Sequence, residues 1–296
     1  MDIENYLKEK RALIDSYLES YFNIPNEHSV LHKAMRYSLF AGGKRIRPIL
    51  ALSAYRACGK DPKHIIPYAS AMELIHTYSL IHDDLPSMDN DDMRRGKPTS
   101  HKVFGEAIAI LAGDALLTEA FSMLTNNFPS ANEIKPTSLI RMIREISLSS
   151  GVHGMVGGQA LDISSENSKP DRDTLAFIHF HKTAALIAVS VKMGGILADS
   201  DETSLKSLTN YGEKIGLAFQ ITDDILNVEG KTEELGKAAG SDAKMRKMTY
   251  PAFYGIERSR QEANNLVAEA IDALALFSSD ADPLREIASY LVQRRV

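Results

Sequence analysis

Apolar residues recur along most of this chain at steps of three and four positions, the spacing that gathers them on one face of an α-helix. Clear stripes of this kind run from Leu13 to Tyr21, from residue 31 to 40 and from residue 108 to 116. Two longer stretches, 174–197 and 204–228, continue the same period. No run of alternating apolar and polar residues is closed by a tight hairpin turn, so the pattern predicts helices and no sheet.

Prolines and polar loops punctuate this pattern without dividing the chain into parts. The sequence has eleven prolines but no linker rich in Pro, Gly and Ser, and no repeat at a period of about 20–50 residues. The polar segments 164–172 and 229–248 are predicted to be loops. We therefore expect one all-α domain over residues 1–296, a bundle of about ten or more helices packed around a common interior.

Composition narrows the class of protein. Lys and Arg number 34 against 39 Asp and Glu, a net charge of −5, which argues against nucleic acid as the main partner. No uninterrupted apolar run reaches the roughly 18 residues of a membrane span, and the polar, acidic N-terminus does not resemble a signal peptide. The single cysteine, Cys58, excludes an internal disulfide and fits a reducing compartment. These features favour a cytoplasmic protein without a membrane span.

The strongest chemical signal lies in residues 74–95, where an apolar helical run ends in five aspartates between positions 83 and 92. Carboxylates this close repel one another unless cations hold them together. A solvated acidic loop is the alternative for any charge run. Here the acids follow an apolar helix and lead into Arg94 and Arg95, an arrangement that suits Mg²⁺ carrying a phosphate-bearing substrate.

A second acidic pair, Asp223 and Asp224, lies in another apolar helical run, and Asn227 follows Asp223 by one helical turn. Two such pairs facing each other across a cavity would clamp a diphosphate through bridging Mg²⁺ ions. Basic residues add possible phosphate contacts, above all the segment Gly42–Pro48, which sets two glycines beside three cations. Taken singly, each of these lysines and arginines would be read as a solvated surface residue.

Six motifs, in this order along the chain, together resemble the trans-isoprenyl diphosphate synthases, and within them the bacterial branch that makes farnesyl diphosphate. The motifs are GGKRIRP at 42–48, DDLPSMD at 83–89 with RRG at 94–96, GGQ at 157–159, KT at 182–183, FQITDD at 219–224 and KMTYP at 247–251. The resemblance covers nearly the whole chain and implies an isoprenoid synthase fold, an all-α bundle with a deep central cavity.

The resemblance also implies a reaction: Mg²⁺-dependent head-to-tail condensation of isopentenyl diphosphate with dimethylallyl or geranyl diphosphate, by ionisation, condensation and elimination. It implies three Mg²⁺ ions per active site, with Mn²⁺ as a substitute, and a homodimer. The residues it implies as metal ligands are Asp83, Asp84, Asp89 and Asp223. Those implied in catalysis are Asp83, Asp84, Arg94, Lys182, Thr183, Gln220 and Asp223. Those implied in substrate binding are Lys44, Arg47, His76, Arg94, Arg95, Lys182, Thr183, Gln220, Lys237 and Lys247.

Three positions refine this expectation. Asn227 stands where the family usually has a third aspartate, which affects only the strength of the third metal site. Tyr78 lies five residues before Asp83, and in the family an aromatic residue there is associated with a floor that limits the product to fifteen carbons. Ser79, beside it, is too small to act as a floor. An ordinary core tyrosine is the alternative reading of Tyr78.

Other functions are weighed against this one. A geranylgeranyl diphosphate synthase of the same family differs only in product length. A terpene cyclase has no need of a second diphosphate site, so the segment Gly42–Pro48 with His76 argues against it. A di-iron helical bundle would need paired Glu-x-x-His motifs, and Glu73 to His76 has no partner motif. A catalytically silent homologue would be expected to lose its aspartates, and the first motif here is complete.

Overall fold

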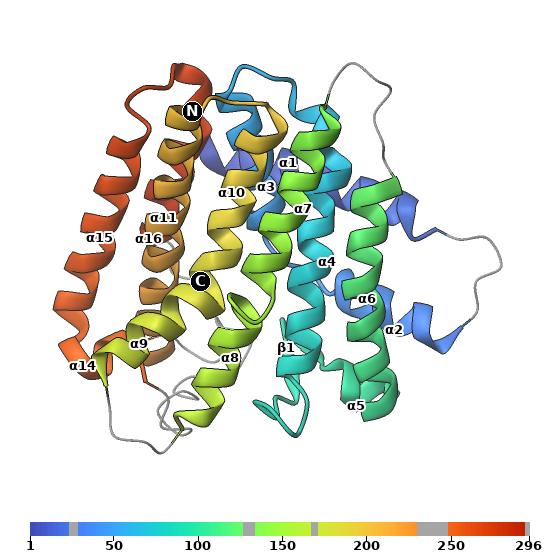
Figure 1. Cartoon of the computed structure of the whole chain (residues 1–296). Helices are drawn as coiled ribbons and strands as arrows, with labels where there is room; N and C mark the ends of the chain where they lie inside the picture. Colours follow the sequence, from blue (N-terminus) through green and yellow to red (C-terminus); the bar gives the residue numbers. More distant parts are fainter. Residues whose placement is uncertain (24–28, 127–133, 167–170, 230–247, 294–296) are drawn as a thin grey trace.

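The chain is described by a computed structural model, which covers residues 1–23, 29–126, 134–166, 171–229 and 248–293 (Figure 1). Apart from one short hairpin, the regular elements in these ranges are helices, which confirms the all-α prediction. The first elements are α1 (Ile3–Tyr21), α2 (Val30–Leu39), α3 (Ile46–Ala57), η1 (Pro62–Ile65) and α4 (Ile66–Asp83). The next are β1 (Met93–Arg94), β2 (Lys97–Pro98), α5 (Ser100–Phe104), α6 (Glu106–Asn126), α7 (Pro136–Ser150) and α8 (Met155–Ser164). The last are α9 (Arg172–Ile178), η2 (His179–Ala184), α10 (Ala185–Leu197), α11 (Glu202–Glu229), α14 (Tyr250–Tyr254), α15 (Ile256–Ala273), η3 (Ser279–Ala281) and α16 (Asp282–Gln293).

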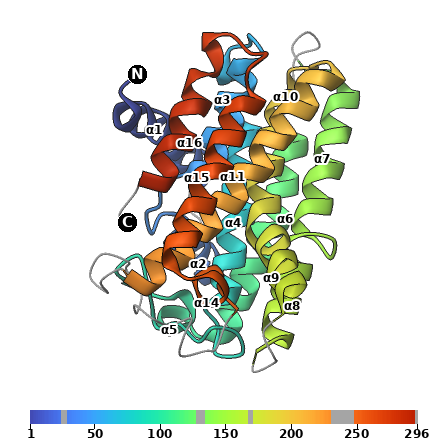
Figure 2. The same ribbon diagram turned by 90° about the vertical axis from the view of Figure 1, so that its left-hand side faces the viewer.

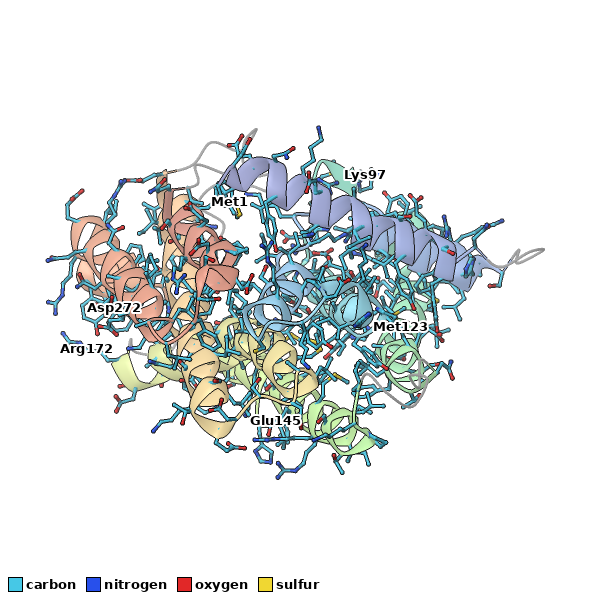
Figure 3. The ribbon with its side chains drawn as sticks, turned by 90° about the horizontal axis from the view of Figure 1, so that it is seen from above. Met1, Lys97, Met123, Glu145, Arg172 and Asp272 are labelled. Carbon is cyan, nitrogen blue, oxygen red and sulfur yellow. The ribbon has the colours of Figure 1, made fainter. Side chains whose placement is uncertain are left out.

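Helices that are apolar on nearly every side form the centre of the bundle. Every residue of α10 except Lys192 is buried, because the helix packs against α3, α7 and α11. The core on one side of α10 joins residues of α1, α2, α4, α6 and α7, and the core on the other side joins α11, α15 and α16. Both α3 and α10 contribute to both cores. Seen from above, most helices are viewed nearly end-on, whereas α1 crosses one side of the bundle lengthwise (Figure 3).

The two acidic motifs lie toward the C-terminal ends of α4 and α11, which point to the same end of the bundle (Figure 1). Helix α4 ends at Asp83 because Pro86, three residues on, has no amide proton and restricts the residue before it. The amide of Asp89 then donates a hydrogen bond of 2.9 Å to the Asp83 carbonyl and folds the acidic segment back. The short helices α5 and α14 lie at this same end (Figure 2).

A small hairpin corrects the expectation that the chain has no strand pairing. Strands β1 and β2 pair antiparallel, with Arg94 opposite Lys97. The two residues between them, Arg95 and Gly96, both have positive φ, at 52° and 74°. Two positive φ angles in a two-residue turn match the twist of an antiparallel pair. The sequence signal was missed because the strands are two residues long and the turn is Arg-Gly rather than Asn-Gly.

The apolar stretch 174–197 is helical as predicted, but it is not one uniform α-helix. Residues His179–Ala184 form a π-helical segment, a wider turn that occurs mostly as a local bulge at functional sites. At Gly158 of α8 a Cβ atom would lie 2.3 Å from the Lys182 amide nitrogen, so α8 packs directly on this bulge. The close approach gives a physical reason for the irregularity, and it presents Lys182 and Thr183 to one cavity.

By length and composition, two helical stretches qualify as membrane-spanning, Glu106–Asn126 and Arg172–Leu197. This test admits charged residues within its window, so it does not contradict the absence of an uninterrupted apolar run. Most of the apolar window in Arg172–Leu197 is buried inside the bundle. Helix α6 packs one face on α4 and leaves Ile110 and Leu111 exposed on another. Core helices of a bundle pass the same composition test, so it is weak evidence for a span.

Candidate active site

A cavity of about 720 Å³ lies between the acidic ends of α4 and α11, within the range of sizes that hold small organic ligands. It gathers most of the site residues expected from the sequence: Lys44, Arg47, His76, Tyr78, Ser79, Asp83, Asp89, Arg94, Arg95, Lys182, Thr183, Gln220, Asp223 and Asn227. Asp84 instead lines a small neighbouring cavity. The predicted substrate-closing residues Lys237 and Lys247 lie outside the described residues.

Asp83 lies partly buried in the cavity wall, close to other carboxylates. Its burial, together with the charges of Asp89 and Asp84, raises its pKa to about 6, although Lys182 and Arg94 act in the opposite direction. Burial is the main cause of this rise, and a cation bound beside Asp83 would favour its ionised form. The buried position of Asp83 among other carboxylates is therefore compatible with a bound cation.

Asp84 has a different environment from Asp83, although the two are adjacent. Its side chain is buried and accepts a hydrogen bond on Oδ1 from Arg94 Nε at 2.7 Å, and Arg94 Nη2 forms an ion pair with the same oxygen at 2.6 Å. The same Nη2 lies 3.6 Å from Asp91 Oδ2. Burial raises the pKa of Asp84, and its bond to Arg94 opposes part of that rise. The contact fixes the Arg94 guanidinium in the wall of the main cavity.

The two aspartates of the second acidic motif also differ from each other. Both line the cavity, but Asp224 is buried and is held on both carboxylate oxygens. Gln220 Nε2 donates to Oδ1 at 2.7 Å, and the Tyr250 amide donates to Oδ2 at 2.8 Å. His179 Nε2, in the π-helical segment, lies 3.2 Å from the same Oδ2. Asp224 therefore joins η2, α11 and the start of α14.

Two further contacts hold side chains of the π-helical segment in the cavity wall. Thr183 Oγ1 donates a hydrogen bond of 2.6 Å to Gln220 Oε1, which continues the chain of contacts from Asp224. Lys182 Nζ donates to Asp162 Oδ2 of α8 at 2.5 Å. Neither Asp162 nor His179 was expected from the sequence. An aspartate inside the apolar stretch 155–163 is the signal that would have indicated Asp162.

Cations form a second wall of the same cavity. Burial, and then the neighbouring Arg95, lowers the pKa of Arg47 to about 10, against the opposing charges of Glu73 and Asp223. Burial lowers the pKa of His76 well below its ordinary value, and Arg47 and Arg95 lower it further. Each shift reports above all the burial of a cationic group away from water, and a bound anion would favour the charged form again. With Lys44, these residues form a wall suited to a diphosphate.

The glycine pair in the segment before α3 makes room for one of these cations. Arg95 Nη1 donates a hydrogen bond to the Gly42 carbonyl. A Cβ atom at Gly43 would lie only 2.5 Å from that same guanidinium nitrogen, and the φ of Gly43 is +122°. The backbone conformation therefore favours glycine at position 43, and any larger residue would also displace the Arg95 guanidinium.

Arg45, which the sequence did not single out, holds this segment from beneath. It is buried, with φ at 53°, and its guanidinium donates to three elements: Asp15 of α1 at 2.8 Å, Glu73 of α4 at 2.7 Å and the Leu39 carbonyl at 2.7 Å. Burial alone would lower the pKa of Arg45, but the two carboxylates outweigh it and raise that pKa. Arg45 thus fixes the backbone that presents Lys44 and Arg47.

The cavity carboxylates suit an Mg²⁺ site that is completed by water and substrate. In the part of the chain that the structure describes, no three His, Cys, Asp or Glu side chains converge closely enough to enclose a metal ion. Mg²⁺ is usually held by one or two carboxylates together with water and substrate phosphates rather than by an all-protein cage. Asp83 and Asp89 from one side and Asp223 from the other supply oxygen ligands of that kind.

The apolar part of the cavity is bounded on one side by Tyr78. Its side chain is buried, and its ring meets His82 edge-to-face with centroids 5.8 Å apart. Burial, and then the charge of Asp83, raises the pKa of the Tyr78 hydroxyl to about 12, so the ring is uncharged. Ser79 lines the same cavity and donates its hydroxyl to the His76 carbonyl at 2.9 Å.

Comparison with known proteins identifies the family to which this fold and site belong. The polyprenyl synthetase family profile matches residues 28–286. The chain belongs to this family. It is 47% identical over 262 residues to a farnesyl diphosphate synthase of Geobacillus stearothermophilus, an alignment that covers 88% of each protein. It is 45% identical over 298 residues to a chloroplastic large subunit of a heterodimeric geranylgeranyl pyrophosphate synthase of Arabidopsis thaliana, over 99% of this chain and 80% of that protein.

Among solved structures, a farnesyl/geranylfarnesyl diphosphate synthase from Zymomonas mobilis superposes with a TM-score of 0.85. It is 37% identical and covers 98% of this chain, with 99% of its own chain matched. The isoprenoid synthase fold expected from the sequence is confirmed. As a member of the polyprenyl synthetase family, the protein is a prenyltransferase that joins isopentenyl diphosphate to an allylic diphosphate. Membership of this family excludes the terpene cyclase and the di-iron helical bundle considered from the sequence.

Proposed function

We propose that this prenyltransferase makes farnesyl diphosphate from dimethylallyl or geranyl diphosphate and isopentenyl diphosphate. The observation that carries the proposal is that one cavity has both an acidic wall, formed by aspartates near the ends of α4 and α11, and a basic wall, formed by Lys44, Arg47, His76 and Arg95, with Tyr78 beside its apolar part. Two diphosphate substrates need two such sites. The whole chain, residues 1–296, is proposed to form the single catalytic domain.

The acidic wall is proposed to receive the allylic substrate. Asp83, Asp89 and Asp223 would hold Mg²⁺, which when bound supplies positive charge to the departing diphosphate. We expect Arg94, fixed by Asp84, to contact the same leaving group, so that Asp84 acts through Arg94. As the allylic C–O bond breaks, its electron pair stays with the diphosphate and C1 becomes a cation.

The basic wall is proposed to hold isopentenyl diphosphate through Lys44, Arg47, His76 and Arg95. Its double bond attacks C1 of the allylic cation, and a proton then leaves the new cation for the released diphosphate. Lys182, Thr183 and Gln220 lie along the wall where this charge develops. The dipoles of Thr183 and Gln220 are fixed by their contact at 2.6 Å, so they need not reorganise during the reaction.

Product length decides between farnesyl diphosphate and the alternative, geranylgeranyl diphosphate. Tyr78→Ala removes the ring from the cavity wall, so the variant should add at least one more isoprene unit, at some cost in stability from the cavity left behind. The products made with Mg²⁺ and both substrates are dephosphorylated and separated by chromatography. Ser79→Ala, its neighbour, removes one oxygen and should keep the wild-type product.

Wild-type protein that makes geranylgeranyl diphosphate would favour a geranylgeranyl diphosphate synthase. Relatives about 45% identical that are named as such synthases support that alternative. A Tyr78→Ala variant that still stops at fifteen carbons would place the floor elsewhere. Protein that releases no diphosphate would instead indicate a catalytically silent homologue.

We also propose that the enzyme acts in the cytoplasm as a homodimer. The exposed Ile110 and Leu111 on α6 are compatible with contact to a second copy, since exposed apolar side chains that lie together can form an interface. Sedimentation equilibrium checks this: Leu111→Lys should shift the wild-type dimer toward monomer, whereas Lys206→Glu, on the exposed side of α11, should not.

A further inference from the structure

Gln159 of α8 is a buried polar side chain without the contacts that burial normally demands. Its exposure is 9%, and it lines the main cavity. Among the residues that the structure describes, neither Nε2 nor Oε1 has a hydrogen-bond partner. A buried amide left unpaired destabilises a folded protein by about 1–3 kcal/mol. The GGQ motif that contains Gln159 has no role in the function proposed above.

The position of Gln159 along α8 is the boundary between the polar and apolar parts of the cavity. One turn later on the same helix, Asp162 accepts the bond from Lys182. One turn earlier, the apolar Met155 lines the cavity. Residues three and four apart lie on one helix face, so all three side chains face the same space. An allylic diphosphate changes from charged to apolar at the atoms that join its diphosphate to its chain.

The side of the cavity on which Gln159 lies indicates which substrate it meets. Helix α8 packs directly on η2, where a Cβ at Gly158 would lie 2.3 Å from the Lys182 amide. The charge of Lys182 acts on Asp83, so this wall adjoins the first acidic motif. The basic wall is built from other elements: the segment before α3, α3 itself, α4 and the β1–β2 hairpin.

We propose that Gln159 binds the diphosphate-bearing end of the allylic substrate, an assignment that rests on the prenyltransferase function proposed above. Its Nε2 donates to an oxygen of the diphosphate, and its Oε1 turns the negative end of the amide dipole toward C1. The polar atoms that lack partners in the protein then find them in the substrate. The cost of burying them is borne by the free enzyme and relieved on binding.

The test uses Gln159→Met, which keeps the length of the side chain and removes both polar atoms. Because it removes an unpaired buried amide, the variant should melt at a higher temperature than wild type. Its kcat/KM for geranyl diphosphate, with Mg²⁺ and saturating isopentenyl diphosphate, should fall at least about tenfold. The KM for isopentenyl diphosphate should stay within about twofold, since that substrate meets the other wall.

Ser70→Ala is the matched control. The Ser70 hydroxyl is fully buried in α4, has no partner among the described residues and lies away from the cavity. Its removal should also leave the melting temperature equal or higher, with wild-type kinetics for both substrates. The pair of variants therefore separates the removal of an unpaired polar group from the loss of a substrate contact.

Three outcomes are distinguished. A Gln159→Met variant with wild-type kinetics would overturn the assignment and leave a bridging water as the partner of the amide. A variant that melts lower and loses both substrates equally would show a structural role and also overturn it. If wild type makes no condensation product, the proposed function fails, and the melting shift on adding geranyl diphosphate with Mg²⁺ still decides on Gln159: wild type should show a larger shift than the variant.

Discussion

The two Asp-Asp pairs of this enzyme look alike in sequence and share one division of labour, but they are anchored differently. In each pair the first aspartate, Asp83 or Asp223, lines the large cavity. The second is buried: Asp84 contacts one guanidinium, whereas Asp224 contacts groups of η2, α11 and α14. The buried aspartate of the first pair therefore positions one arginine side chain, and that of the second pair joins three parts of the fold.

Two aspartates in the same sequence motif can therefore have different roles, one facing the substrate cavity and the other anchoring neighbouring side chains. Adjacent residues near a helix end point in directions about 100° apart, so two neighbouring carboxylates meet different partners, even though Asp223 and Asp224 both line one cavity. The more buried carboxylate of each pair must be paired in the protein, since an isolated buried carboxylate is costly. Substitutions in and beside the two pairs test this difference.

The largest effect is expected when a cavity-facing aspartate is removed. Asp83→Ala or Asp223→Ala should lower turnover by about a thousandfold or more, because each removes a metal ligand at the leaving group. Steady-state diphosphate release measures the loss. Asp92→Ala is the control, an exposed aspartate of the same acidic segment that does not line the cavity. An Asp83→Ala enzyme near wild-type turnover would sink the assignment.

The anchoring aspartates should differ in stability. Asp224→Ala leaves a buried amide, the Gln220 side chain and His179 without their acceptor, and should lower the free energy of unfolding by about 3 kcal/mol or more. Asp84→Ala should cost about 1–2 kcal/mol, because Arg94 is partly exposed and still faces Asp91. Urea denaturation measures both. Equal losses would contradict the contrast in anchoring.

The raised pKa of Asp83 predicts a pH dependence in the metal-free protein. The folded state holds this proton up to about pH 6, whereas the unfolded carboxyl has its ordinary pKa of 3.8. The free energy of unfolding should therefore fall as the pH rises from about 4 to about 6, and stay reduced above that range. Asp83→Asn in the presence of a chelator should exceed wild type by about 1–2 kcal/mol at pH 7.5 and match it at pH 4.

Asp92→Asn is the control for this measurement. The bond from Lys102 lowers the pKa of Asp92, so that its charge is favoured in the folded state. Neutralising it should bring no gain in stability at pH 7.5. If Asp83→Asn also brought none, the crowding of negative charge in the first motif would be refuted.

The smallest effect is expected at Asn227, which is buried and lines the cavity one turn after Asp223. Asn227→Asp should change the Mg²⁺ concentration for half-maximal rate by less than about tenfold, or 1.4 kcal/mol, since Asp223 supplies the principal ligand. Metal titration of the rate measures it. A change above a hundredfold in either direction would make position 227 a principal site.

Much of the fold follows from periodicity alone. Stretches such as 204–228 carry one apolar face whose period only an α-helix satisfies, and Pro86 marks the end of α4. The π-helical segment was not predictable in this way, because its contact with α8 at Gly158 joins residues that only the tertiary fold brings together. The hairpin that carries Arg94 and Arg95 is too short to leave a period.

The site divides along the same line. The order of motifs along the chain identified Lys44, Asp83 and Asp223 as site residues, and the structure places all three in one cavity. The network of Arg45 joins residues from α1, α2 and α4 that only the tertiary fold brings together. Glu73 could have been suspected, since it is a charge within the apolar stretch 66–83 and therefore needs a buried partner.

The most direct test of the account is to locate the metal ions. Crystals grown with Mn²⁺ and geranyl diphosphate, measured at the manganese absorption edge, give anomalous peaks that mark each ion. The account predicts peaks within coordination distance, about 2.0–2.3 Å, of Asp83, Asp89 and Asp223, with Arg94 still bound to Asp84 and Tyr250 to Asp224. A peak coordinated by Asp84 or Asp224, or none beside Asp83 and Asp223, would contradict it.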